Sequence, residues 1–403
     1  MRKSIKKIMQ LVQQVQIKHS KLLDNITFLS KNLYNVATYT IRQRFFKDRH
    51  WVRYHELWNL LKTHDSYQVL QEACGSHPPQ QVLKQVDRNF KSFFNAIKQW
   101  KIAPLRFLGM PRLPHYMRKN GRNMLYFTSL QCRVRDGVIL LTRKMERLGF
   151  PKIKTDIPNV KGVRITPFGD RYNVELIYEQ EIQDVHLNEK NMMGIDLGLA
   201  NIVTASDTSG NKPLIIKGGV VKSINQFYNK ELAKYKSMSK KCNNTDITRR
   251  ILKLHRKRNN KVRDFFHKTS RVVVNYCISH DIGTIIIGYN EWWKQNIKIG
   301  KKNNQNFVSI PFLTFVRQIE YKSEMVGIKV LKVTEEYTSQ TCSSCGVISK
   351  SNRKYRGLYV CKECGLVLNA DVNAARNIIQ KGVPKSIWRG DRGCLNHPVV
   401  LKV

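Results

Sequence analysis

The first hundred residues carry apolar side chains at helical spacing. In LLDNITFLSKNLYNVATYTIRQRFF the apolar positions recur every three to four residues, as Leu29, Leu33, Val36 and Tyr39 illustrate. A second stretch, QVLKQVDRNFKSFFNAIKQW, keeps the same period. Because one face of an α-helix repeats about every 3.6 residues, the pattern predicts amphipathic helices through residues 21–106.

The pattern changes near residue 107. The segment GMPRLPHYMRKNG is irregular and basic, and three β-forming runs follow it: MLYFTS, CRVRDGVILLT and GVRITPFGDRYNVELIYE. The pairs Asp136-Gly137 and Gly169-Asp170 have the composition of hairpin turns. We therefore expect a small β-rich unit over residues 107–182.

From Asn191 onward the pattern is typical of an α/β domain. An apolar strand ends on Asp196, and a second strand is expected over residues 200–205. The run 282–287 and the segment VGIKVLKVTEEYTSQ predict parallel strands, with SIPFLTFVRQIEYKSEMVG as their crossover helix. Residues 220–280 form a long basic helical stretch, and NADVNAARNIIQ predicts a last helix. The expected fold class is multidomain α/β plus β.

The charge balance narrows the class of partner. Seventy-one Lys and Arg stand against 29 Asp and Glu, a formal net charge of +42 over 403 residues. A compact chain with this excess repels itself unless a polyanion neutralises it, and nucleic acid does so with release of counterions. A basic membrane-surface protein is the weaker alternative, because the charge is spread along the chain and does not gather beside an apolar helix.

Compartment signals point to the cytoplasm. No run of about 18 apolar residues predicts a membrane span. The basic N-terminal segment lacks the apolar core and cleavage site of a signal peptide. Nine cysteines, an odd number, suit reduced thiols and a metal site better than a disulfide framework. We expect a cytoplasmic, nucleoid-associated protein without a membrane partner.

Four of the cysteines form one pattern. TCSSCGVISKSNRKYRGLYVCKECG has the spacing C-x2-C-x15-C-x2-C. Each CxxC pair points two thiolates at one centre, and four thiolates complete the shell of a structural zinc ion. A ribbon over residues 341–365 is therefore expected to bind Zn²⁺ through Cys342, Cys345, Cys361 and Cys364. Its basic, aromatic loop suits either nucleic acid or a solvated hairpin tip.

Acidic residues stand at strand ends and at the start of the last helix. Asp196 ends the first strand of the α/β domain, Glu335 and Glu336 end a parallel strand, and Asp371 opens the last helix. Asp196 capping a turn and Asp371 as a helix N-cap are the ordinary structural alternatives. Converging carboxylates would suit Mg²⁺, with Mn²⁺ as a substitute. Two such ions about 4 Å apart promote phosphodiester cleavage.

Several blocks resemble one known family. In order, GIDLGLANIVT, YTSQTCSSCG, the second CxxC and ADVNAARNI are similar to the C-terminal half of TnpB (OrfB) proteins. MPRLPHYMRKNG, TSLQCRVRDGVI and DFFHKTSRVVV extend the resemblance to nearly the whole chain. TnpB proteins are transposon-encoded, RNA-guided DNA endonucleases related to the type V CRISPR effectors. DVNAARNI and TSQTCSSCG are the most specific of these blocks.

The resemblance implies a domain plan and a set of partners. The N-terminal part is implied to be a β-barrel wedge domain (1–20 and 107–185) with an inserted helical recognition domain (21–106). A RuvC nuclease domain of RNase H-like fold follows (190–340 and 366–382), and the zinc ribbon (341–365) interrupts it. The chain ends in a tail (383–403). A guide RNA from the transposon end and double-stranded target DNA are the implied partners. The protein would read a short motif beside the target, and base pairing would read the rest. A monomer is favoured.

The family's second catalytic acid is missing from its usual position. Asp196 and Asp371 match the first and third acids, whereas Gly288 stands where the family has a strand-ending Glu. The TEEYTS segment resembles a branch in which this Glu has moved to the position of Glu335. Strand alternation places Glu335 and Glu336 on opposite faces, so only one of them serves.

Three functional hypotheses follow. The first is an RNA-guided, Mg²⁺-dependent DNA endonuclease with Asp196, Glu335 and Asp371 as its catalytic, metal-binding acids; Glu336 and Glu291 remain the alternatives for the second acid. The second hypothesis is a nuclease-dead RNA-guided DNA-binding repressor, which Gly288 favours. The third is a transposase acting without RNA, which the absence of a helix-turn-helix pattern disfavours.

Overall fold

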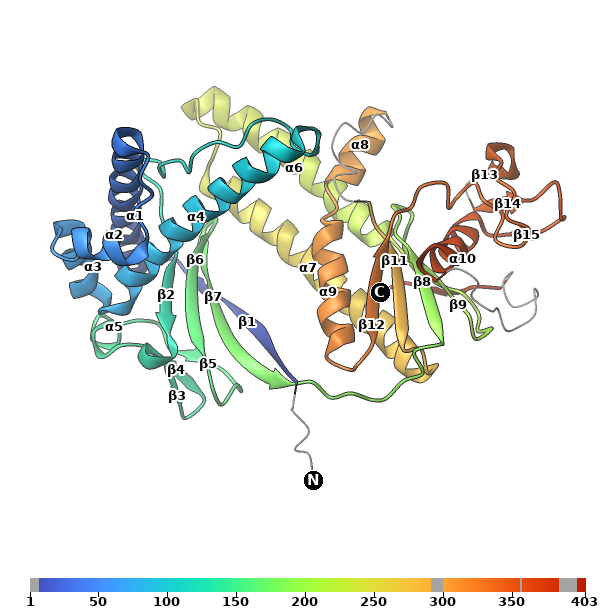
Figure 1. Ribbon diagram of the computed structural model, residues 1–403, viewed down its shortest axis with the longest axis horizontal. Coiled ribbons are helices and arrows are strands. Elements are labelled where there is room, and N and C mark those ends of the chain that lie inside the picture. Colours follow the sequence, from blue (N-terminus) through green and yellow to red (C-terminus); the bar gives the residue numbers. More distant parts are fainter. Residues whose placement is uncertain (1–6, 291–299, 356, 384–396) are drawn as a thin grey trace. The chain divides into compact units, whose positions relative to one another are not determined.

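The computed structural model describes residues 7–290, 300–355, 357–383 and 397–403. The chain divides into two compact units (Figure 1): an N-terminal unit, Ile8–Gln180, and a C-terminal unit, Met1–Lys7 with Glu181–Val403. Within the described ranges, no helix combines the length and apolar character needed to cross a membrane.

Four helices follow the first strand of the N-terminal unit, where the apolar spacing predicted helices. They are α1 (Lys21–Asp48), α2 (Tyr54–Leu61), α3 (Asp65–Cys74) and α4 (His77–Ile102). Ser20 caps α1 by accepting a hydrogen bond from the Leu23 N–H at 3.2 Å. Two prolines occupy the first turn of α4, where a missing N–H costs no helical hydrogen bond. The apolar faces of these helices share one core with the neighbouring strands.

The strands of this unit form two sheets. The larger has the order β1 (Ile8–Lys18), β7 (Arg171–Glu181), β6 (Gly162–Phe168), β2 (Leu125–Thr128). The smaller consists of β3 (Arg133–Arg135), β4 (Val138–Leu140) and β5 (Ile153–Lys154), and α5 (Arg143–Arg147) lies between β4 and β5 in the chain. Both predicted hairpin turns are confirmed. Asp136 and Gly137 join β3 to β4 with positive φ angles, and Gly169 does the same between β6 and β7.

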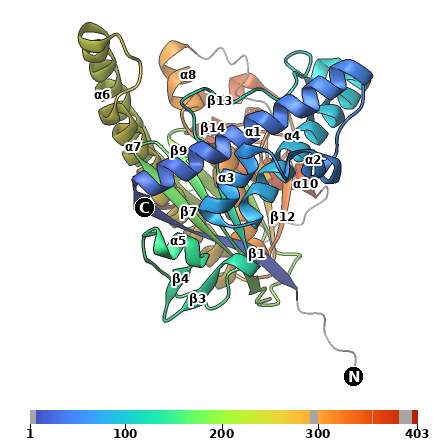
Figure 2. The same ribbon diagram turned by 90° about the vertical axis from the view of Figure 1, so that its left-hand side faces the viewer.

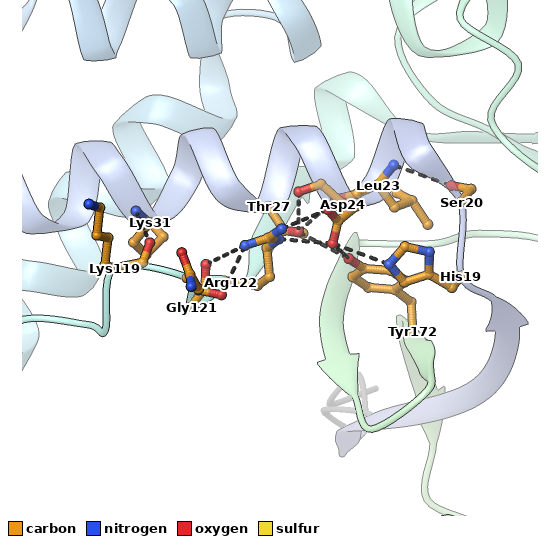
Figure 3. A network of polar contacts seen from close by, with 11 residues as sticks. His19, Ser20, Leu23, Asp24, Thr27, Lys31, Lys119, Gly121, Arg122 and Tyr172 are labelled. Carbon is orange, nitrogen blue, oxygen red and sulfur yellow. Dashed lines mark hydrogen bonds and ion pairs between the residues drawn. The ribbon is translucent and has the colours of Figure 1, made fainter. Parts of the chain in front are cut away.

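Arg122 joins α1 to the irregular basic segment before β2. Its guanidinium donates hydrogen bonds to the Asp24 carboxylate at 2.6 and 2.9 Å (Figure 3), and this lowers the pKa of Asp24. The Tyr172 hydroxyl lies 3.5 Å from the same carboxylate, and the buried Lys31 ammonium donates to the Lys119 carbonyl at 2.9 Å. Paired polar groups therefore hold this segment in place, since it has no regular secondary structure of its own.

A six-stranded sheet forms the centre of the C-terminal unit. Its order is β12 (Lys329–Val333), β11 (Thr284–Gly288), β8 (Met192–Asp196), β9 (Asn201–Asp207), β10 (Leu214–Lys217), β16 (Val399–Leu401). Strands β8 to β10 are antiparallel, and β11 is parallel to both β8 and β12. The predicted parallel pair and its crossover helix, α9 (Phe312–Glu324), are therefore confirmed.

The sheet differs from the expected one in the end of β12 and in an additional edge strand. Strand β12 ends at Val333, so Glu335 lies in the turn that follows the strand and not at its last residue. The tail, which the sequence left without a structural role, contributes β16 as a parallel neighbour of β10. A short edge strand carries too few residues to give a reliable sequence pattern, which explains the omission.

Helices pack on both faces of the sheet. Side chains of α7 (Arg249–Ser279) and α9 share a core with Met193 and Ile195 of β8. On the other face lies α10 (Ala370–Gly382), and a Cβ atom at Gly194 would stand 2.1 Å from the Ala375 carbonyl oxygen. Because strand residues alternate between faces, Asp196 points to the α10 side, as Gly194 does.

The basic stretch after β10 folds as two long helices. α6 (Gly219–Asn243) and α7 pack side by side (Figure 2), and α8 (Lys301–Val308) follows later in the chain. Arg258 of α7 donates a hydrogen bond to the side-chain oxygen of Asn225 at 2.8 Å and also bonds the Ser309 carbonyl. One partly buried guanidinium thus connects α6, α7 and the end of α8.

The four-cysteine segment lies between β12 and α10 in the chain. It contains β13 (Arg353–Tyr355), β14 (Leu358–Val360) and β15 (Val367–Leu368), which form an antiparallel three-stranded sheet. Tyr359 and Leu368 of this sheet share a core with Ala370 and Val372 in the first turn of α10. The ribbon is therefore packed against the last helix and is not a separate module.

Candidate metal centres

The four predicted zinc ligands lie together. Their sulfur atoms all stand within 4.8 Å of one another, and two of the separations are 3.6 Å. A tetrahedral zinc with bonds of about 2.3 Å would separate its sulfurs by about 3.8 Å. The four residues therefore fit Zn²⁺: Cys342, Cys345, Cys361 and Cys364. Among the described residues, no other group of three or more Cys, His, Asp or Glu side chains brings its ligand atoms this close together.

Each CxxC pair forms a tight turn closed by glycine. The Gly346 N–H donates to the Cys342 carbonyl at 2.9 Å, and the Gly365 N–H donates to the Cys361 carbonyl at 3.1 Å. Both glycines have positive φ angles, a conformation that other residues adopt only with strain. A hydrogen bond from the Leu366 N–H lowers the pKa of the Cys364 thiol to about 7, which favours the thiolate that zinc requires.

The three predicted acids line one open pocket of about 260 Å³. Asp196 comes from the end of β8, Glu335 from the turn after β12 and Asp371 from the first turn of α10. The parallel strands bring their carboxyl ends to one edge of the sheet, where ligands commonly bind. Asp371 is not the N-cap of α10. Asn369 takes that role by accepting from the N–H groups of Asp371 and Val372 at 2.9 and 3.4 Å.

Gly288 leaves the space that the Glu335 side chain occupies. A Cβ atom at position 288 would stand 2.7 Å from Cγ of Glu335 and 2.6 Å from Cδ1 of Ile378. The Glu335 N–H donates to Oδ1 of Asn290 at 2.9 Å, and the Thr338 hydroxyl donates to the Glu335 carbonyl at 2.8 Å. The Glu335 side chain therefore occupies the space that a side chain at position 288 would need.

The alternatives for the second acid lie elsewhere. Glu336 is exposed and does not line the pocket. Glu291 lies outside the described residues. Of the candidates that the structure describes, Glu335 alone shares a pocket with Asp196 and Asp371.

The acids perturb one another. Burial and the negative charge of Asp196 together raise the pKa of Glu335 to about 9, although the positive charge of Lys381 opposes the shift. Burial also raises the pKa of Asp196 to about 7, with a further contribution from Asp371 and an opposing one from Arg353. Oε1 of Glu335 is buried without a hydrogen-bond partner among the described residues. A buried carboxylate oxygen with no donor and two acidic neighbours is suited to a cation.

Two residues that the sequence did not single out as site residues contact Asp371. Asn201, at the start of β9, donates to Oδ2 of Asp371 at 2.9 Å and accepts a hydrogen bond from the Lys217 ammonium at 3.0 Å. Arg353 of the ribbon donates to Oδ1 at 3.2 Å and lines the same pocket. The basic ribbon loop was noted in the sequence, but nothing in it indicated that Arg353 turns toward the acids.

Two protein-family models match segments of this chain. Residues 175–294 match the family described as a probable transposase (OrfB_IS605), and residues 312–378 match the Cas12f1-like TNB domain. The chain is therefore similar to TnpB-like proteins and to Cas12f1 endodeoxyribonucleases, in agreement with the resemblance seen in the sequence.

Three relatives show the extent of the likeness. A CRISPR-associated endodeoxyribonuclease Cas12f1 of Sulfoacidibacillus thermotolerans is 31% identical over 54% of this chain and 52% of its own length. The putative RNA-guided DNA endonuclease InsQ of Escherichia coli strain K12 is 28% identical over 76% of this chain and 74% of its own length. The TnpB-like protein L770 of Acanthamoeba polyphaga mimivirus is 27% identical over 58% and 46%. The chain thus spans about half the length of two of these three relatives.

A solved structure shares the fold. The chain aligns with a cryo-EM structure of a Cas12f1–sgRNA–target DNA complex at a TM-score of 0.56 and 14% sequence identity. The alignment covers 90% of this chain and 83% of the other. The mixed α/β fold expected from the sequence is therefore confirmed.

Replacing one cysteine of the cluster should release zinc. We expect purified wild-type protein to contain one zinc ion per chain, and Cys342→Ser to lose it because three thiolates leave the shell incomplete. Elemental analysis of the two proteins measures this. Cys242→Ser is the matched control, since Cys242 is exposed and outside the cluster. Full zinc content in Cys342→Ser would contradict the assignment.

Adding a methyl group at Gly288 should weaken divalent-metal binding. Gly288→Ala pushes its Cβ into the Glu335 side chain, so we expect Mn²⁺ affinity to fall about tenfold, as for other changes behind a metal ligand. Paramagnetic resonance of free Mn²⁺ measures the affinity. Gly219→Ala is the control, because its Cβ meets no atom within 4 Å. Equal affinities in the two variants would reject the role given to Gly288.

Divalent-metal affinity should rise with pH. The raised pKa values, about 7 for Asp196 and about 9 for Glu335, mean that near pH 6 both groups hold protons that a metal ion must displace. We expect the affinity for Mn²⁺ to increase about tenfold per pH unit for each proton displaced. Titrations between about pH 6 and pH 8 test this. Asp196→Asn removes one titrating group and should flatten the dependence; an equal slope in the variant would contradict the assignment.

Proposed function

We propose that this protein is an RNA-guided, Mg²⁺-dependent DNA endonuclease. The observation that carries the hydrolytic part is the common pocket of Asp196, Glu335 and Asp371, with Gly288 leaving space for Glu335. The guided part is supported by the relatives, one of which is named as an RNA-guided DNA endonuclease and another as an endodeoxyribonuclease. The net charge of +42 supports large polyanionic partners.

The donor set of the pocket suits hard divalent cations. Asp196, Glu335 and Asp371 offer carboxylate oxygens, and the partnerless Oε1 of Glu335 is one of them. Mg²⁺, or Mn²⁺ in its place, would supply an activated water and stabilise the leaving oxygen of a phosphodiester. In the described residues these acids are not gathered as closely as the four cysteines. The Asp196 carboxylate interacts electrostatically with both of the other acids.

Neighbouring side chains prepare the pocket for a phosphate. Asn201 holds one oxygen of Asp371 by donating to it, so the other oxygen keeps a fixed direction. Arg353 pairs with that second oxygen at 3.2 Å. Once cations neutralise the acids, the Arg353 guanidinium can turn its donors to a phosphate, for which its planar fork is suited. The proposal therefore gives Arg353 a substrate-binding role at this site.

The remaining parts of the chain fit the same proposal. The basic helices α6 and α7 are suited to lie along a guide–target heteroduplex, which proteins recognise by its shape and backbone. The N-terminal unit would supply the wedge and recognition domains, and the sheet of the C-terminal unit the RuvC domain with RNase H-like strand order. We further propose a guide RNA from the transposon end, a short target-adjacent motif, a monomeric protein and a cytoplasmic, nucleoid-associated location.

A nuclease-dead, RNA-guided repressor is the second candidate. Gly288 favours it, because a Glu is lost from that position. The position of Glu335 argues against it, since its Cγ lies where a side chain at 288 would begin. A transposase that acts without RNA is the third candidate, and binding measurements with and without RNA separate it from the first two.

Removing any one of the three acids should abolish cleavage. We expect Asp196→Ala, Glu335→Ala and Asp371→Ala to lose more than about a thousandfold in cleavage rate, because each change removes a metal ligand. Gel assays of a matched target with the purified protein–RNA complex measure the rates. Glu336→Ala is the adjacent-residue control and should cleave normally, since Glu336 is exposed. Full activity of Glu335→Ala would reject it as the second acid, and binding without cleavage by wild type would select the repressor.

Copurifying RNA should determine which DNA is bound. We expect RNase treatment of the purified complex to abolish sequence-specific DNA binding, because base pairing and not the protein reads most of the target. Sequencing the RNA before treatment supplies the guide, and electrophoretic shift with matched and scrambled targets measures specificity. A scrambled target is the control. Specific binding that survives RNase would favour the transposase.

A further inference from the structure

Helix α10 presents amide side chains to the chain segment that joins Glu335 to the zinc ribbon. Asn373 and Asn377 are 0% and 4% exposed and lie one helical turn apart, so they share one face. Buried amides cost free energy unless they are hydrogen-bonded, and here they bond backbone groups of residues 338–343. Neither the capping of α10 by Asn369 nor the acid Asp371 explains why Asn373 and Asn377 are buried here.

Asn373 fixes the peptide groups on both sides of Cys342. Its Nδ2 donates to the Thr341 carbonyl at 2.7 Å, and its Oδ1 accepts from the Ser343 N–H at 3.0 Å. One planar amide thus holds two backbone groups that flank the first cysteine of the cluster. Gln380, two turns further along α10, adds a bond to the Ser343 carbonyl at 3.3 Å.

Asn377 fixes the turn that carries Glu335. Its Nδ2 donates to the carbonyls of Thr338 and Thr341, both at 2.7 Å. Thr338 in turn donates its hydroxyl and its N–H to the Glu335 carbonyl at 2.8 and 3.2 Å. The Lys381 ammonium donates to the Thr334 and Glu336 carbonyls on either side of Glu335. The turn is therefore held to α10 along its length.

We infer that Asn373 and Asn377 are positioning residues that couple the zinc ribbon to the acid pocket. One rigid helix carries Asp371 and holds, through these amides, both Cys342 and the turn of Glu335. A change at either metal centre therefore alters the backbone that the other centre depends on. The coupling is reciprocal by thermodynamic linkage: zinc strengthens divalent-metal binding at the acids by the same factor by which that metal strengthens zinc binding.

This inference rests on the proposed metal-binding role of the acids, but its test does not need nuclease activity. Mn²⁺ affinity is measured by paramagnetic resonance on the zinc-loaded full chain without nucleic acid, and zinc retention by competition with a chromophoric chelator. Mn²⁺ prefers oxygen ligands, so it reports on the acids and not on the cysteines. We expect Asn377→Ala and Asn373→Ala to lower Mn²⁺ affinity about 10- to 100-fold, and Asn373→Ala to release zinc faster.

Asn35→Ala provides a matched control. Asn35 makes the same pair of bonds in the N-terminal unit, donating to the Met117 carbonyl at 3.0 Å and accepting from its N–H at 2.8 Å. Its loss should leave both metal affinities unchanged, even if that unit is destabilised. Asn373→Asp, which keeps the acceptor for the Ser343 N–H, should recover part of the zinc retention that Asn373→Ala loses.

Stripping zinc from the wild-type chain gives a second measurement if the variants do not fold. Chelation of zinc should lower Mn²⁺ affinity, and re-addition of zinc should restore it. Unchanged Mn²⁺ affinity in the zinc-free chain and in Asn377→Ala would overturn the coupling. Failure of the metal site itself looks different, because Asp196→Ala and Asp371→Ala would then also leave Mn²⁺ affinity unchanged.

Discussion

The close approach of α10 to the central sheet is the constraint on which the acid pocket and the four-cysteine cluster both depend. Gly194 presents no side chain, so the backbone of α10 at Ala375 comes nearer to β8 than any larger residue would permit. This contact places Asp371, at the start of the helix, over the end of the strand that carries Asp196. The same helix then supplies the amides that hold the ribbon and the Glu335 turn. A small residue in a strand thus sets the position of groups far apart in the sequence.

Glycine acts in a second way at position 288. There the missing side chain leaves room for the carboxylate of Glu335, which lies in the turn after the neighbouring strand β12. Neighbouring strands lie about 4.8 Å apart, so a Glu can move from one to the next and still reach the same region. The two glycines differ in what fills the space beside them: helix backbone at Gly194 and an acidic side chain at Gly288.

The acid pocket also shows why a strongly basic chain keeps a few buried acids. Burial and the neighbouring negative charges disfavour the ionised forms of Asp196 and Glu335, and this raises the pKa values of both. Arg353 and Lys381 relieve part of that repulsion from the edges of the site. In the proposed function, divalent cations bound among the carboxylates would relieve the rest of that repulsion.

The sequence by itself determined the elements and the four cysteines of the cluster. Helical spacing before residue 106, the turns at Asp136-Gly137 and Gly169, and the parallel strands around β11 follow from local periodicity and turn chemistry, which adjacent residues decide. The CxxC pairs were recognisable without the tertiary structure, because the spacing within each pair brings its two thiolates together. Family likeness in turn named Asp196, Asp371 and Glu335 as candidates.

Only the tertiary structure decided how these candidates meet. Strand alternation separated Glu335 from Glu336, but β12 ends before either residue, so the turn and its bonds to Asn290 and Thr338 set the direction of Glu335. The contacts of Arg353 and Asn201 with Asp371 join residues 18 and 170 positions apart, and no local pattern encodes them. The roles of Asn373 and Asn377 depend likewise on a surface that forms only when the ribbon folds back on α10. Local physics fixes which elements form, whereas long-range packing fixes which side chains share a site.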